Sequence, residues 1–284
     1  MKARGAALVL VLWVVALLAT TIAAFALTAR VEHLQGRVTG DLAGGEQIAH
    51  AGIDYALSRM RATPTQPSWR ADGRPYRWQF DGRTVELRIV DETGKVDLNQ
   101  ADLNLLQALL RGLELAPDKA ARLAGAIVDW RDPDSLLQVA GGAETADYQA
   151  AGLPYGAKNA PFDSVSELQR VLGMEPALYV QLVPLVTVYG SARPNPRFSP
   201  GPVLTAMGMD AALILAQRER EDGNPGMGET SAGGGDTGTY SVTSKVQLVA
   251  ERQAVVRAVV RLNPGGVVGA PYTVLQWEQG AMSR

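Results

Sequence analysis

The chain of 284 residues contains no cysteine and only two histidines, His33 and His50. The lack of cysteine excludes disulfides, thiol catalysis and cysteine-based zinc sites. The scarcity of histidine leaves little room for histidine-dependent catalysis. A formal net charge of −2 excludes binding of nucleic acid or anionic lipid by bulk charge. Because the sequence also lacks a nucleophile elbow, P-loop, HExxH motif and dinucleotide fingerprint, we expect a protein that is not an enzyme.

The chain does contain a long apolar run near its start. The run extends from Ala6 to Ala29 and meets no charge until Arg30. A helix needs about 20 such residues to cross a hydrocarbon core of about 30 Å. The run is therefore long enough to span a membrane, and every functional hypothesis has to include a membrane or export through one.

Three interpretations of this run are open. A cleaved secretory signal would end at the small-x-small site Ala24-Phe25-Ala26, although its apolar region is usually only about 7–15 residues long. In a plain membrane anchor, Lys2 and Arg4 predict a cytoplasmic N-terminus and an exported body. A pilin-like leader is a short basic peptide that ends in glycine, here Gly5, before an apolar helix that continues as an amphipathic helix.

The residues after the run continue the helical pattern. Apolar side chains recur at three- and four-residue spacing as far as Met60, and the first proline beyond the run is Pro64. A helix over residues 6–61 would be about 80 Å long at 1.5 Å per residue. Because that length exceeds a bilayer, we expect the second half of the helix to pack on a folded domain.

Two blocks of β-strand pattern flank the middle of the chain. Residues 76–90 alternate apolar and polar side chains on both sides of Asp81-Gly82, a strong signal for a hairpin with a two-residue type I′ turn. Further strand patterns occur at 242–249, 255–262 and 272–277. A helix followed by antiparallel strands predicts an α+β fold, in which the C-terminal strands complete the sheet that the hairpin begins.

The sequence pattern in the middle of the chain predicts helices. Three short stretches share the order helix, Gly-apolar-acid, helix. Their central residues are Gly112-Leu113-Glu114, Gly173-Met174-Glu175 and Gly208-Met209-Asp210. Asn99 or Asp102 is a plausible N-cap of the first unit, and Ser164 with Glu167 predicts a capping box in the second. The pattern suggests repeated helix-hairpin-helix or SAM-like units.

An acidic cluster in this region is the best candidate for a binding site. It surrounds Gly141-Gly142 and consists of Asp129, Asp132, Asp134, Glu144 and Asp147. Loops rich in carboxylate oxygens suit calcium, which takes six to eight oxygen ligands. The alternative is that Asp132 and Asp134 end a helix in a solvated turn. Asn159 could add an amide oxygen, although a turn before Pro161 is the favoured role.

The hairpin units also raise the alternative of a membrane-anchored helix-hairpin-helix protein that binds DNA in a competence-like system. Such units present backbone N–H groups to phosphate at a Gly-x-Gly turn. Here an acid, Glu114, Glu175 or Asp210, stands at the second glycine. Residues 91–190 hold 14 acids and 7 bases, whereas a DNA-binding module needs a basic face. We therefore expect no binding of nucleic acid.

Several motifs together resemble one family. They are the leader Lys2-Ala3-Arg4-Gly5, residues 91–99 (DETGKVDLN), residues 129–134 (DWRDPD), Gly142-Ala143-Glu144 with Tyr148, and residues 159–162 (NAPF). The chain resembles, over essentially its whole length, the minor pseudopilin K family of the bacterial type II secretion system. The mid-chain motifs are much more specific than the leader.

The resemblance implies how the protein is processed and where it works. A prepilin peptidase would cut after Gly5 and methylate the new N-terminus, Ala6. The protein would be a structural cap at the tip of the periplasmic pseudopilus, anchored once in the inner membrane with its N-terminus in the cytoplasm. Its expected partners are other minor pseudopilins, with the outer-membrane secretin or secreted substrates as further contacts. The family is also known to bind calcium, which favours the acidic cluster as a calcium site.

One residue departs from the general pilin pattern. Most pilins carry a glutamate at the fifth mature position, which pairs with the N-terminal amine of a neighbouring subunit. That position here is Leu10. A carboxylate in lipid is costly unless it is paired, so its absence suits a subunit with no neighbour above it. The alternative is that Leu10 is simply part of a membrane anchor.

The predicted fold is therefore α+β, with a pilin-like N-terminal helix packed on an antiparallel sheet and a large helical insertion. The expected segments are a leader, 1–5; a membrane-spanning or fibre-core helix, 6–29; an amphipathic helix with the first β-hairpin, 30–90; a helical insertion domain, 91–220; a flexible Gly-rich loop, 221–239; and the C-terminal strands, 240–284.

Overall fold

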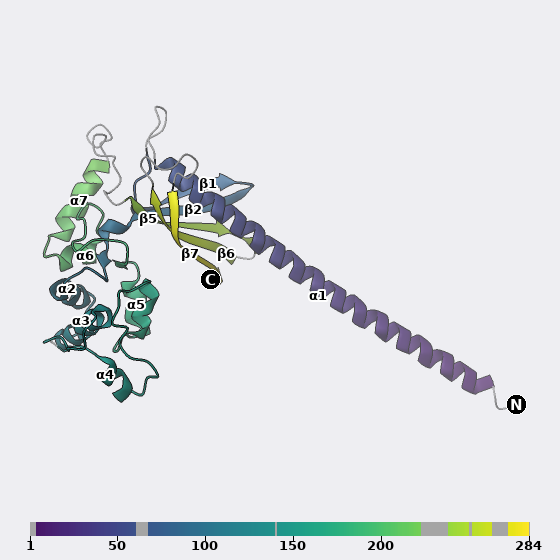
Figure 1. Cartoon of the computed structure of the whole chain (residues 1–284). Helices are drawn as coiled ribbons and strands as arrows, with labels where there is room; N and C mark the ends of the chain where they lie inside the picture. The colour runs from purple at the N-terminus through teal and green to yellow at the C-terminus, as the bar shows by residue number, and fades with distance from the viewer. Residues whose placement is uncertain are drawn as a thin grey trace.

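The computed structural model describes residues 4–60, 68–139, 141–222, 238–249, 252–262 and 272–283. A single helix, α1 (Arg4–Arg59), dominates the shape of the molecule. Its 56 residues correspond to about 84 Å at 1.5 Å per residue. The N-terminal half projects alone from the body, whereas the C-terminal end lies across a sheet (Figure 1). The predicted long helix is thus confirmed, and its glycines do not interrupt it.

The sheet combines strands from both sides of the helical region. Its members are β1 (Asp72–Phe80), β2 (Arg83–Asp91), β5 (Thr239–Gln247), β6 (Arg252–Leu262) and β7 (Tyr272–Ser283). The spatial order is β1-β2-β5-β6-β7, and all neighbouring pairs are antiparallel. Asp81 and Gly82 join β1 to β2 with φ values of 50° and 69°, as a type I′ turn requires. The predicted hairpin and the completion of the sheet by C-terminal strands are both confirmed.

Small residues let α1 approach the sheet closely. Ala49 and Ala56 are fully buried in the core between the helix and strands β2, β5 and β6. A Cβ atom on Gly52 would lie only 2.5 Å from Ser244 Oγ and 3.0 Å from Leu87 Cδ2. By contrast, a Cβ atom on Gly44 would have no atom within 4 Å. The glycine at position 52 therefore sets the distance between helix and sheet.

The region between β2 and β5 folds into a separate helical block, at the left of Figure 1. Its elements are η1 (Glu92–Gly94), β3 (Val96–Asp97), α2 (Leu103–Gly112), α3 (Pro117–Arg131), α4 (Thr145–Ala150), η2 (Val165–Arg170), α5 (Pro176–Leu182), β4 (Val186–Thr187), α6 (Gly201–Ala206) and α7 (Ala211–Asp222). The short strands β3 and β4 pair in parallel. The block has its own apolar core, which includes Trp130, Tyr148 and Leu106.

The local turn chemistry of the block agrees with the sequence except at one cap. Asp102 caps α2, since its Oδ1 accepts a hydrogen bond from Leu105 N at 2.8 Å. The capping box predicted for Ser164 and Glu167 is wrong. Ser164 Oγ bonds Ser166 Oγ at 2.7 Å, and Glu167 accepts from Asp163 N and from Lys158. Lys158 and Asp163 N thus occupy the Glu167 carboxylate that the capping box would need. The element that follows Ser164 is a 3₁₀ helix.

A buried ion pair lies where the block meets the sheet. Lys95 Nζ is 2.5 Å from Glu92 Oε1, and the side chains are 4% and 2% exposed. Lys95 also lies 3.4 Å from Ser241 Oγ on β5. Burial alone would raise the pKa of Glu92, but the charge of Lys95 and its hydrogen bond outweigh burial and lower that pKa. The pair joins the start of the block to the sheet without leaving a lone buried charge.

The two histidines of the long helix differ in their surroundings. His33 is exposed, whereas the ring of His50 packs on Trp277 of β7 with centroids 4.7 Å apart. His50 therefore contacts the protein's own sheet. Most of the predicted loop 221–239 lies outside the described residues, which resume at Gly238.

Candidate metal site

The acidic cluster lies at the C-terminal end of α3. The helix ends at Arg131 because Asp132 has extended backbone angles and Pro133 follows it. The guanidinium of Arg131 donates hydrogen bonds to Leu98 O and, at 2.6 Å, to Ala101 O. These bonds fix the end of α3 against the loop before α2, so the turn that carries Asp132 and Asp134 has a defined position.

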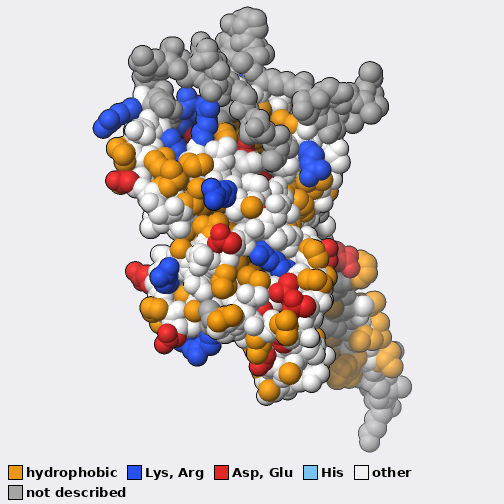
Figure 2. All heavy atoms as spheres, turned by 60° about the vertical axis from the view of Figure 1, so that its left-hand side comes forward, with side chains coloured by type: hydrophobic (Ala, Val, Ile, Leu, Met, Phe, Trp, Pro, Cys, Tyr) orange, Lys and Arg blue, Asp and Glu red, His pale blue; other side chains and the backbone are white. Residues whose placement is uncertain are grey.

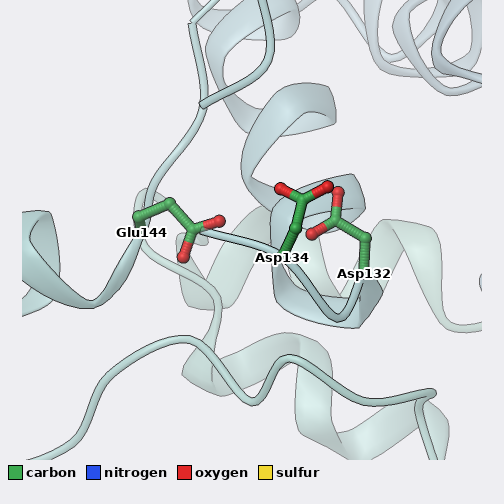
Figure 3. A group of neighbouring side chains, drawn as sticks. All are labelled: Asp132, Asp134 and Glu144. Atoms are coloured by element: carbon green, nitrogen blue, oxygen red, sulfur yellow. The ribbon is translucent and has the colours of Figure 1, made fainter. Parts of the chain in front are cut away.

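Three carboxylates converge beyond this helix end. Asp132 and Asp134 come from the turn, and Glu144 comes from the segment just before α4. Figure 3 shows the carboxylate of Glu144 directed toward the two aspartates. One oxygen from each of the three residues lies within 4.8 Å of the others, a spacing that a single cation can bridge.

Glycines allow the loop to close over Asp129. Asp129 Oδ2 accepts a hydrogen bond from Ala143 N at 2.9 Å. A Cβ atom on Gly142 would lie 1.9 Å from that same Oδ2, and one on Gly125 of α3 would lie 1.7 Å from Gly141 O. No side chain fits at either position. The glycine pair 141–142 and Gly125 therefore let the loop that leads to Glu144 lie directly against Asp129.

The two remaining candidate ligands, Asp147 and Asn159, make different contacts. Asp147 points to its own helix terminus, since its Oδ2 accepts from Glu144 N at 2.9 Å. Asn159 is in the left-handed region, with φ 51°, and its Nδ2 donates to Asp134 O at 2.8 Å. Asn159 thus serves as the predicted turn residue and also lies at the cluster, whereas Asp147 positions Glu144.

Five oxygen atoms around the cluster are buried without a hydrogen-bond partner in the described part of the chain. They are Asp129 Oδ1, Asp132 Oδ1, both carboxylate oxygens of Glu144, and Asn159 Oδ1. An unpaired buried acceptor costs about 1–3 kcal/mol, and more if it is charged. Native structures satisfy such atoms with protein groups, water or ions. An all-oxygen donor set of this kind is what Ca²⁺ prefers, so the residues present fit that cation.

The pKa values of the carboxyl groups in the cluster also favour a bound cation. Burial, and then the charge of Asp134, raises the pKa of Asp132 above its usual range. Burial, and then the charges of Asp129 and Asp132, raises the pKa of Glu144 in the same way. Each carboxylate disfavours ionisation of the next, and a bound cation would reverse that effect.

Sequence reasoning found the carboxylates but not the residues that bring them together. Gly125 stands inside a helical pattern, and an isolated glycine there is a recognisable signal for close backbone approach. The sequence named Asn159 as a further oxygen donor, but its hydrogen bond from Nδ2 to Asp134 O, across 25 residues, had no comparable signal.

The fold has a relative among solved structures. A chain in the crystal structure of the GspK-GspI-GspJ complex from the type 2 secretion system of enterotoxigenic Escherichia coli aligns with a TM-score of 0.62. The alignment covers 87% of this chain and 99% of that chain, at 20% sequence identity. The molecule thus has the α+β pseudopilin fold, in which a long N-terminal helix packs on an antiparallel sheet with further helices.

Part of the chain is similar to a known family. Residues 86–191 match the family model of type II secretion system protein K. The protein K of Klebsiella pneumoniae is 28% identical over 208 residues, and that of Pectobacterium carotovorum subsp. carotovorum is 27% identical over 208 residues. Each alignment covers 65% of this chain and 62% of the relative. The protein K of Aeromonas hydrophila is 40% identical over 80 residues, 28% of this chain and 24% of that protein.

Residues 86–191 thus match the protein K family, and the resemblance of the chain to minor pseudopilin K is confirmed. These matches give no support to the alternative of a DNA-binding protein. Figure 2 shows acidic and basic side chains interspersed on the face of the helical block, with no continuous basic patch on that face.

The predicted processing residues lie at the start of α1. Gly5, Ala6 and Leu10 all belong to the helix, and the described part from Leu8 onward is long and apolar enough to cross a membrane. None of its most apolar window is buried inside the molecule. The helix is thus suited to a single membrane anchor, and cleavage after Gly5 stays a prediction.

Proposed function

We propose that this protein is a structural minor pseudopilin that caps the tip of the type II secretion pseudopilus and helps to initiate the fibre. The observation that carries the proposal is the protein K match over residues 86–191, joined in one chain to an exposed apolar stem, α1. Its role is assembly rather than catalysis. It supports protein export across the outer membrane as part of the fibre.

The proposed partners are other minor pseudopilins. The solved relative comes from a complex with GspI and GspJ, which motivates the same kind of hetero-oligomer here. The apolar half of α1 would lie in the inner membrane or the fibre core, with the N-terminus in the cytoplasm and the body in the periplasm. Further contacts with the secretin or with secreted substrates would occur at the tip.

The helical insertion and Leu10 both suit a terminal position. Residues 91–220, with hairpin units of helix-hairpin-helix or SAM-like type, would obstruct a subunit stacked above. Leu10 replaces the glutamate that would pair with the N-terminal amine of such a subunit. A prepilin peptidase would cut after Gly5 and methylate Ala6.

The acidic cluster is proposed as a calcium site. Asp129, Asp132, Asp134 and Glu144 would supply carboxylate oxygens, and Asn159 would add its amide oxygen. Asp147 would hold the segment of Glu144 in place. The cation would fix the loop 132–144 against α3. Such a cross-link would stabilise an exported chain that has no cysteine for disulfides.

Mass spectrometry of the mature N-terminus tests the assignment directly. The sample is the full protein purified from membranes of cells that contain the prepilin peptidase. We expect the first residue to be Ala6 and to carry one methyl group. A mature protein that begins at Leu27 would instead identify an ordinary cleaved signal and would exclude the pseudopilin. A Gly5→Ala variant should accumulate uncut, whereas a Gly36→Ala variant should be processed normally.

A further inference from the structure

One carboxylate marks the place where α1 leaves the body of the molecule. Every residue of α1 from Leu8 to Gly40 is exposed, and Asp41 is the next residue, which the body partly covers. The Asp41 side chain is 15% exposed. One turn later the contact is close, because a Cβ atom on Gly45 would overlap the side chain of Leu248. Asp41 therefore stands at the boundary between the free stem of α1 and the part that packs on the sheet.

Two hairpin connections at one end of the sheet bind this carboxylate. Asp41 Oδ1 accepts a hydrogen bond at 2.8 Å from Arg83, the first residue of β2. Asp41 Oδ2 lies 3.6 Å from the guanidinium of Arg252, the first residue of β6. The same oxygen accepts a hydrogen bond from Val249 N at 3.4 Å. Each oxygen of Asp41 thus contacts a different hairpin, and we call the group of Asp41, Arg83 and Arg252 the Asp41 clamp.

The helix is intrinsically weak beside the clamp. A Cβ atom on Gly36, Gly40 or Gly44 would have no atom within 4 Å, so close packing within the chain does not require glycine at these positions. Glycine lowers helix stability relative to alanine, and glycines are among the few causes of sharp helix kinks. The helix nevertheless continues through all three positions. The clamp is a contact with the body inside this weak stretch, where it can hold the helix straight.

A small bend at this place would move the stem a long way. The stem from Leu8 to Gly40 is about 50 Å long at 1.5 Å per residue. A kink of about 20° at its base would shift the far end by about 17 Å. Figure 1 shows no other described element beside the N-terminal half of α1 that would limit such a movement. The direction of the stem therefore depends on contacts at its base.

We propose that Asp41 is a positioning residue, which fixes the direction in which the stem leaves the body. Arg83 and Arg252 hold its carboxylate from two hairpins, so a bend of α1 at this place has to separate an ion pair. A single exposed ion pair contributes little, whereas a partly buried carboxylate with two cations acts as a network. The proposal deepens the proposed function, because a fibre subunit needs a fixed angle between stem and body, and it rests on that function only for this use.

Distances between two spin labels measure the direction of the stem. Because the chain has no cysteine, Glu32→Cys on the stem and Arg77→Cys on β1, both at exposed positions, give two labels without a background site. The full, uncut chain in lipid nanodiscs should give one narrow distance distribution. In Asp41→Ala we expect the distribution to become about twofold broader, because the glycines beside the clamp are then free to bend. The urea midpoint of the body should stay the same, which a general loss of structure would not allow.

Two further variants test the clamp and the glycines separately. Arg83→Gln/Arg252→Gln removes both cations and leaves α1 unchanged, so it should broaden the distribution as Asp41→Ala does. Asp41→Ala/Gly40→Ala/Gly44→Ala lacks the clamp but has a stiffer helix. We expect its distribution to return toward the width of the parent.

The matched control is Glu46→Gln, which removes a charge from the same helix but not from the clamp, and it should keep the narrow distribution. The proposal is overturned if the arginine double variant keeps the width of the parent, if Glu46→Gln broadens the distribution equally, or if the added alanines do not narrow it. A mature N-terminus at Leu27 would contradict the proposed function, yet it would leave these distances in the uncut chain unchanged. The two failures are therefore distinguishable.

Discussion

At the scale of single residues, the unusual feature is a group of oxygen atoms with no hydrogen-bond partner in the part of the chain that the structure describes. Buried acceptors in native structures nearly always have one, and here five lie within one cluster. Three of the residues concerned are carboxylates, for which an unpaired buried charge is especially costly. A bound divalent cation would satisfy the oxygens together and explain why the sequence keeps so many acids in one loop.

We expect calcium to stabilise the protein through this cluster. A ligand present at about 100 times its Kd adds about 2.7 kcal/mol, which corresponds to roughly 5–10 °C in Tm for a domain of this size. The measurement is the Tm of the full chain in detergent with calcium and with chelator. The shift should disappear in Asp132→Asn/Glu144→Gln and persist in Glu175→Gln, which alters only an exposed pair with Lys119. An equal shift in all three proteins would exclude the cluster as the site.

A glycine variant tests the geometry without removing a ligand. In Gly142→Ala the new Cβ would collide with Asp129 Oδ2, so the loop has to move away from α3. We expect this variant to lose most of the calcium-dependent shift although every carboxylate is present. Gly112→Ala is the matched control, because a Cβ atom there would have no atom within 4 Å. Retention of the full shift in Gly142→Ala would show that Asp129 is not needed.

The pH dependence of stability should change sign with calcium. The pKa values of Asp132 and Glu144 are raised in the folded chain. Such groups stabilise the fold below their unfolded pKa, about 4, and this contribution is lost as pH rises through the folded pKa. In chelator, the Tm of the wild type minus that of Asp132→Asn/Glu144→Gln should therefore fall as pH rises above about 4. In calcium the same difference should rise, because the cation needs ionised carboxylates.

At the scale of elements, the close packing of α1 on the sheet depends on the glycines that face the sheet. We expect Gly52→Ala to destabilise the fold by about 1–3 kcal/mol, since its Cβ would overlap Ser244 and crowd Leu87. Gly44→Ala, on the same helix with open space around it, should stabilise by about 1 kcal/mol. Urea unfolding of the full chain in detergent, followed by tryptophan fluorescence, measures both. Equal effects would mean that Gly52 does not limit the approach.

The elements also show what the sequence could and could not predict. The hairpin at Asp81-Gly82, the cap at Asp102 and the helices around Gly208 follow from local patterns, and each is present. The capping box at Ser164 failed because Lys158 binds the carboxylate of Glu167. For the site, the carboxylates could be predicted from their spacing. The contact of Gly125 with Gly141 and the hydrogen bond of Asn159 to Asp134 could not, because both are set by how α3 and its neighbouring loops pack.

At the scale of the whole molecule, the ion pair between Glu92 and Lys95 joins the helical block to the sheet. Removal of one partner from a buried pair typically costs about 3–5 kcal/mol because the other charge stays unpaired. We expect Glu92→Gln to destabilise the protein by about that amount. The double variant Glu92→Leu/Lys95→Met should recover most of the loss, as measured by urea unfolding. A double variant as unstable as Glu92→Gln would indicate that the charges themselves are needed.

The order of the strands has a consequence for how the chain folds. The hairpin emerges early, but its partner β5 follows only after the whole helical block, so the pairing of Asp91 with Tyr240 closes a loop of about 150 residues. Closing so long a loop from a disordered chain is slow. The contacts Thr93–Asn195 and Lys95–Ser241 place the beginning of the block beside its later part and beside β5. A block that folds first would thus bring β5, and with it β6 and β7, next to the unpaired edge of β2.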